Sequence, residues 1–189
     1  LDTGSNPMLT RLSLGGSVTN QGTLDFSTNG NAAGATLTFT GATNASITGG
    51  GTVTNVRAVT ASKGTSASLT LDAPGFAVRG QTADTLGFLT LASGTFRIAG
   101  SFTMCSPVFT NGTYSLPSGT TFWLDNPNFT VAPMSGSATV RGLRISAGSF
   151  QVGDSTNHSL QFASGSQVTI EGGEVRTAGR FAVGSATNA

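Results

Sequence analysis

The stretch LTLASGTFRI, residues 89–98, carries the pattern that decides the fold. Leu89 and Leu91 flank one polar residue, and after four spacer residues Phe96 and Ile98 repeat the arrangement. Because successive side chains of an extended chain point to opposite sides, each half predicts a short strand with one apolar side. The spacer between the halves predicts a corner that joins the two strands.

The same pattern recurs at four other places in the chain. Segments that start at Leu69, Phe122 and Leu143 share the spacing, and a segment that starts at Leu160 has one extra residue before Val168. Every spacer contains Pro or Gly. Turn-forming residues therefore recur in phase with the strands.

A parallel β-solenoid requires such a repeat, because a single coil cannot bury its apolar side without stacking on copies of itself. We expect the initial apolar residues of the five segments to lie in one column along the axis. The pairs Leu12/Leu14 and Leu37/Phe39 predict two further coils, and residues 101–120 a partial one. Seven or eight coils at roughly 4.8 Å each would form a rod about 35 Å long.

The predicted fold class is all-β, a right-handed parallel β-helix that spans residues 1–189 as a single domain. The right-handed sense follows from the preference of parallel crossover connections for that hand. The chain begins without Met and ends in the loop-like GSATNA, so we expect an excerpt of a longer chain. An antiparallel β-sandwich is the alternative, since it also combines short strands with frequent Gly turns.

The charge composition argues against several classes of partner. Nine Lys and Arg residues stand against eight Asp and Glu residues, for a net charge of +1. This balance creates no field strong enough to gather nucleic acid or an anionic membrane, and no apolar run is long enough for membrane insertion. With one cysteine, Cys105, and one histidine, His158, we expect no disulfide, no metal site and no cofactor.

Two carboxylates occupy the same position of the repeat and form the candidate catalytic pair. Asp72 and Asp125 each follow the second inward residue of a segment. One intervening coil would separate them by about 9 to 10 Å, at the edge of the range for an inverting glycosidase. Both also precede a corner, where Asp commonly caps turns. We expect a non-enzyme, with a polysaccharide-active hydrolase or lyase as the alternative.

Outward-facing residues supply the candidate binding sites. Trp123 is predicted to project outward, where an indole can stack on a sugar or a partner, and Arg144 to share its surface. Rows of Thr on a flat solenoid face can order water, so ice binding is a minor alternative. The predicted outward row consists of Ser13, Thr38, Thr70, Thr90, Trp123, Arg144 and Gln161.

The C-terminal two thirds of the chain carry a family resemblance. The phrases at residues 102–131, 143–155 and 168–186, such as VTIEGGEVRTAGRFAVGSA, resemble the β-helical repeat regions of very large secreted or cell-surface proteins of Bacteroidota-type bacteria. Those adhesin-like proteins often end in a type IX secretion sorting domain, which is not present here. The resemblance covers roughly residues 69–189 and implies a β-helix exported to the cell surface, with no catalytic residues to carry over.

The resulting expectation is a non-catalytic structural or adhesive β-helix segment, secreted or at the cell surface, that acts as a stalk, adhesin, or matrix or filament component. Its expected partners are polysaccharides or other surface proteins that contact the outer faces. End-to-end self-assembly is a further hypothesis, because terminal coils of a solenoid expose strand edges.

Overall fold

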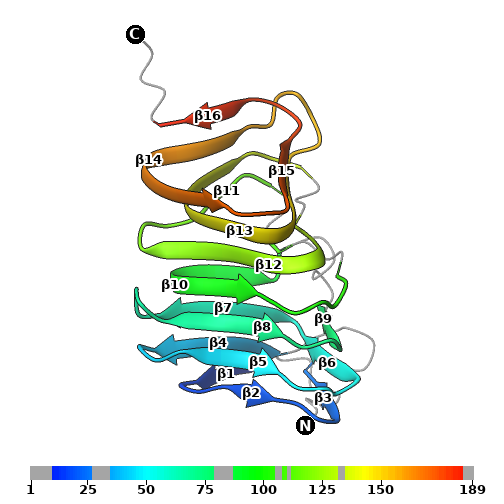
Figure 1. The fold of residues 1–189 in the computed structure, drawn as a ribbon. Coiled ribbons are helices and arrows are strands. Elements are labelled where there is room, and N and C mark those ends of the chain that lie inside the picture. The colour runs from blue at the N-terminus through cyan, green and yellow to red at the C-terminus, as the bar shows by residue number, and fades with distance from the viewer. Residues whose placement is uncertain are drawn as a thin grey trace.

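The structure is a computed structural model that describes residues 10–26, 35–78, 87–104, 108–109, 112–131 and 135–184. These ranges contain strands and no helix. The strands follow one another as stacked layers from the N-terminal to the C-terminal end (Figure 1). Every strand pair is parallel. The predicted all-β parallel solenoid is therefore confirmed, and the antiparallel sandwich is wrong.

Each coil passes over three faces of the rod. The first face contains β1 (Thr10–Leu14), β4 (Ala35–Gly41), β7 (Ala58–Lys63), the first half of β10 (Leu89–Ile98), β11 (Tyr114–Ser115), the starts of β13 (Ala138–Val152) and β14 (Leu160–Ile170), and β16 (Phe181–Val183). The second face contains β2 (Val18–Thr19), β5 (Ala45–Thr48), β8 (Ser68–Asp72), the second half of β10, the start of β12 (Thr120–Val131), the middle of β13 and the end of β14. The third face contains β3 (Thr23–Asp25), β6 (Val53–Val56), β9 (Phe76–Val78), the ends of β12 and β13, and β15 (Glu174–Thr177).

The second face shows the stacking most completely. Seven strand segments follow one another on it, so about six turns separate the first from the last. On the first face Leu12 pairs with Leu37 and Leu14 with Phe39, so both coils predicted from these apolar pairs are confirmed.

The predicted column of five apolar residues is wrong in two of its members. Leu69, Phe122 and Leu143 do share a column of the second face, but Phe96 lies between the first two and Val168 follows the last. Leu89 and Leu160 belong to the first face, where they pair with Val59 and Ala138. The pattern recurs at two different corners because either corner joins two strands that bury alternate residues.

Four phenylalanine rings contact one another in series through the middle of the core, and we call this series the phenylalanine stack, although only the rings of Phe96 and Phe122 are parallel-stacked and the other pairs are edge-on or tilted. The ring centroids of Phe88 and Phe96 are 6.4 Å apart, those of Phe96 and Phe122 also 6.4 Å, and those of Phe122 and Phe150 5.9 Å. All four side chains are at most 2% exposed. Such ring pairs add about 0.5–1.5 kcal/mol each beyond the area that they bury, so neighbouring coils are tied together from inside.

Candidate functional site

The predicted outward row is divided between two faces. On the second face the outward column runs in the order Ser46, Thr70, Arg97, Trp123, Arg144 and Thr169. The remaining predicted members lie on the first face, where Ser13, Thr38 and Thr90 share a column with Thr60, and Gln161 pairs with Thr139. The single predicted row is therefore wrong, for the same reason as the apolar column.

Arg97, Trp123 and Arg144 form a stack on the second face, which we call the Arg–Trp–Arg ladder. The guanidinium carbon of Arg97 lies 4.2 Å from the centroid of the indole ring, and that of Arg144 lies 4.1 Å from it. The three residues pair directly across neighbouring strands, so the two guanidinium groups cover opposite faces of the indole. This arrangement leaves neither face of Trp123 free for a sugar ring.

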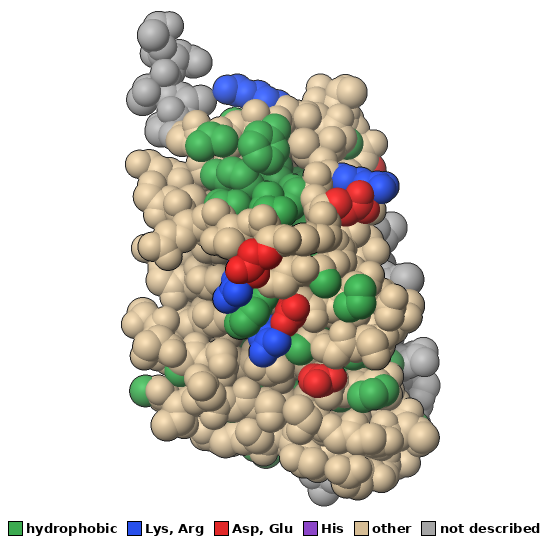
Figure 2. Space-filling model, viewed as in Figure 1, with side chains coloured by type: hydrophobic (Ala, Val, Ile, Leu, Met, Phe, Trp, Pro, Cys, Tyr) green, Lys and Arg blue, Asp and Glu red, His purple; other side chains and the backbone are tan. Residues whose placement is uncertain are grey.

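Carboxylates neutralise both cations of the ladder. Arg97 donates from Nε to Asp125 Oδ2 at 3.0 Å, with a second contact from its terminal nitrogen. Arg144 donates from Nε and Nη2 to the two oxygens of Glu171 at 2.9 and 2.8 Å, a bidentate pair. Figure 2 shows acidic and basic side chains next to each other on this side of the molecule.

A hydroxyl links the indole to the same carboxylate. Trp123 Nε1 donates to Ser146 Oγ at 2.9 Å, and Ser146 Oγ donates to Glu171 Oε2 at 2.7 Å. Together with the Arg–Trp–Arg ladder, these bonds connect β10, β12, β13 and the residue that follows β14. The outer network therefore spans four successive coils.

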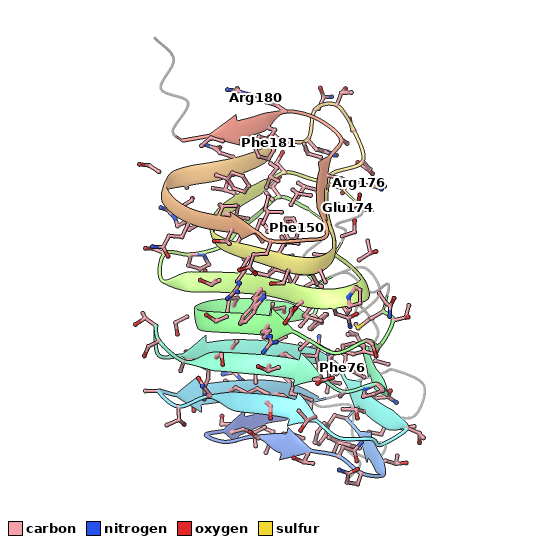
Figure 3. All side chains as sticks on the ribbon, in the orientation of Figure 1. Phe76, Phe150, Glu174, Arg176, Arg180 and Phe181 are labelled. Carbon is pink, nitrogen blue, oxygen red and sulfur yellow. The ribbon has the colours of Figure 1, made fainter. Side chains whose placement is uncertain are left out.

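The hydrogen bonds from Arg144, and next those from Ser146, lower the pKa of Glu171. The bond to Glu171 correspondingly raises the pKa of Arg144. On β15, the neighbouring Arg176 lowers the pKa of Glu174 through a 2.8 Å hydrogen bond (Figure 3). All of these groups are solvent-exposed, so a single ion pair adds little to stability, and the coils are held in register by the network that the bidentate Arg144–Glu171 pair forms with Ser146 and Trp123.

The two candidate catalytic carboxylates lie in one column of the second face. Asp72 follows Leu71 and Asp125 follows Leu124, and these leucines are aligned with Ile98 between them. One coil, carrying Ala99 in this position, thus separates the carboxylates, at roughly 9 to 10 Å from the spacing of strands.

The surroundings of the two carboxylates differ. The carboxylate of Asp125 is held by Arg97, which neutralises it. The carboxylate of Asp72 lies over Gly100, where a Cβ atom would be only 2.1 Å from Oδ1. Within the described ranges, no group of three or more His, Cys, Asp or Glu side chains gathers as a metal site.

His158, which was singled out from the sequence, is not part of the Arg–Trp–Arg ladder. His158 sits in the loop between β13 and β14, with Nδ1 2.9 Å from Asp154 Oδ1. Cys105 lies outside the described residues.

The first face carries an array of hydroxyl side chains, of which the repeat pattern predicts Ser13, Thr38 and Thr90 but not Thr60. Ser13, Thr38, Thr60 and Thr90 form one column, and beside it Thr40 pairs with Ser62. The strand β7 that completes the array has the sequence AVTASK, whose buried residues Val59, Ala61 and Lys63 do not form a pair of large apolar side chains. The alternation of Val59 and Ala61 with the hydroxyl residues Thr60 and Ser62 is the signal in the sequence that could reveal this strand.

The comparisons with known proteins identify no relative: the chain matches no protein-family model, no curated protein and no solved structure. In the part of the chain that the structure describes, no helix has the length and hydropathy needed to span a membrane.

Proposed function

We propose that this chain is a non-catalytic structural or adhesive segment of an extracellular β-helix protein, serving as a stalk, a surface adhesin, or a matrix or filament component. The observation that carries the proposal is the Arg–Trp–Arg ladder. The two arginines bond to carboxylates of neighbouring coils and pack on the indole between them. The charged and aromatic groups of this surface therefore hold adjacent coils together.

The core supports the same proposal. The phenylalanine stack runs without interruption from Phe88 on one coil to Phe150 on another. A solenoid coil contacts only its neighbours, so an internal stack and an external ladder that both cross coils resist bending and separation of the rod. Resistance to such forces is what a stalk needs.

Product release from polysaccharides tests the proposal. The protein is incubated with a panel of neutral and acidic polysaccharides, and both bound protein and soluble sugar products are measured. We expect binding to polymer without product release. Product release that disappears in Asp72→Asn or Asp125→Asn, but persists in Asp154→Asn as a control, would establish a polysaccharide-active enzyme instead.

A second candidate function is ice binding, which the hydroxyl array of the first face favours. Four Ser and Thr residues in register at the strand spacing form a regular, uncharged column, in which the hydroxyl oxygen of Thr38 is shielded from solvent. Thermal hysteresis that is present in the wild type, lost in Thr60→Lys and retained in Thr70→Lys on the second face would support this candidate. No thermal hysteresis in the wild type would reject it.

A further inference from the structure

The corners between the first and second faces differ in length from coil to coil. Between the pairs Val140/Phe162 and Gly142/Gln167, β13 has one residue, Arg141, where β14 has four, residues 163–166. The shortest of these corners therefore carries an arginine and lies beside a corner that bulges outward.

The corner on the other side of Arg141 is also longer. Ser115 pairs with Thr139 and Phe122 with Leu143, so residues 116–121 lie opposite residues 140–142. Two protruding corners thus flank a recessed one. They enclose a surface notch of about 370 Å³, whose lining includes Ser118, Thr121, Arg141, Gly142, Ser164 and Gln167. We call it the Arg141 notch.

The charge inside the Arg141 notch is unbalanced. The side chain of Arg141 is exposed, and no ion pair or side-chain hydrogen bond involves it within the described ranges. None of the lining residues is acidic. By contrast, Arg97, Arg144 and Arg176 are each bound by a carboxylate. Arg141 is therefore free to bind an anion from outside the chain.

The other groups of the Arg141 notch specify what kind of anion fits. A guanidinium group matches the planar, two-oxygen geometry of a carboxylate. Hydroxyls of Ser118, Thr121 and Ser164 and the amide of Gln167 both donate and accept hydrogen bonds, as sugar hydroxyls require. The volume is at the lower end of the range for small-ligand sites, which suits a short stretch of a polymer that continues past the notch.

We propose that the Arg141 notch binds a carboxylated sugar unit of an acidic polysaccharide, with Arg141 bonding to the carboxylate and the surrounding hydroxyls to the sugar. This proposal rests on the proposed adhesive function and names its ligand class. A single cation on a nearly neutral chain does not suit nucleic acid, which needs several basic contacts along its backbone.

The test measures affinity for polygalacturonate, with fully methyl-esterified polygalacturonate and neutral dextran as matched polymers. We expect wild-type protein to bind polygalacturonate only. Arg141→Gln should weaken this binding at least about tenfold, because it removes a charge-assisted hydrogen-bonded pair. Arg141→Lys keeps the charge but lacks the parallel N–H donors of the guanidinium group, so its affinity should lie between those of the wild type and Arg141→Gln. Circular dichroism verifies that each variant is folded.

Arg180→Gln is the matched control, because it removes the same charge from an exposed arginine that does not line the notch. Equal weakening by Arg180→Gln and Arg141→Gln would overturn the proposal in favour of diffuse charge attraction. Binding of dextran sulfate without binding of polygalacturonate would also overturn it, since the ligand would then be a sulfate. Failure to bind any acidic polymer would reject the notch proposal alone, whereas product release in the polysaccharide panel would reject the structural function.

Discussion

Trp123 is the residue on which the outer network converges. It is the only tryptophan of the chain, lies between two guanidinium groups and donates its indole N–H to Ser146. The sequence places Trp123 outside the core correctly, because Phe122 and Leu124 on either side are buried. The sequence also predicts Arg144 as the next member of the outward row, but it does not place Arg97 on the other side of the indole, since that requires the register between strands far apart in the chain. Fluorescence of Trp123 therefore reports on the Arg–Trp–Arg ladder without interference from other tryptophans.

Acidification should release the ladder from Glu171. The pKa of Glu171 is lowered from its usual value of 4.5 in the folded state, so its contribution to stability is present above that value. The contribution is lost as pH falls through the lower, folded-state pKa. We expect Trp123 fluorescence to stay constant from pH 7 to about 5 and to change below about 4.5. Glu171→Gln should lack this change, and an unaltered transition in that variant would show that Glu171 is not its cause.

At the scale of the element, one sequence pattern serves two different corners. The segments that start at Leu69, Phe122 and Leu143 turn from the second face to the third, whereas those that start at Leu89 and Leu160 turn from the first face to the second. Local alternation and turn residues predict strand, corner and strand correctly in each copy. They do not say which corner a copy occupies, because both corners satisfy the same burial pattern.

Glycine substitutions at corners should separate backbone strain from steric contact. Gly94 has a φ of +81°, and a Cβ there would lie 2.7 Å from the carbonyl oxygen of Ala67. Gly165 has a similar φ of +74° with nothing near its Cβ position, and Gly16 has open space. Alanine in the left-handed region costs about 1–3 kcal/mol. We expect urea unfolding to rank the loss of stability Gly94→Ala above Gly165→Ala above Gly16→Ala.

A reversed order of Gly94→Ala and Gly165→Ala would show that the corner of β10 relaxes around the added methyl group. Equal stability of all three variants would contradict the positive φ angles at both corners.

At the scale of the whole molecule, stability is distributed along a rod rather than gathered around one centre. The exposed large hydrophobic residues of the described chain, Ile170, Phe181 and Val183, are 51–76% exposed and lie towards the C-terminal end of the rod, where Figure 2 shows a gathering of apolar side chains. Phe181 lies near that end in Figure 3. End-to-end assembly stays a prediction, which light scattering on the full-length protein can test.

Removal of a central ring should loosen the rod locally. Phe122 is fully buried and contacts the rings of Phe96, Phe109 and Phe150. Phe122→Ala should cost about 3–5 kcal/mol of unfolding free energy, and Phe122→Leu much less. Because coils interact only with their neighbours, hydrogen exchange should increase in β10, β12 and β13 before β4 and β5. A uniform increase along the rod would contradict this picture of local coupling.

The sequence by itself determined the class of fold: the alternating apolar residues and the recurring Gly and Pro corners are local features, and local features suffice to predict short strands that must stack. The register between coils was decided only by the tertiary structure. The coils differ in length, so the distance in sequence between two paired strands varies, and no local pattern specifies it. For this reason the sequence predicts one column for five residues that the structure divides between two faces, with Leu89 and Leu160 on the first. For the same reason the Arg–Trp–Arg ladder, the hydroxyl array and the Arg141 notch became visible only when strands distant in sequence were placed side by side.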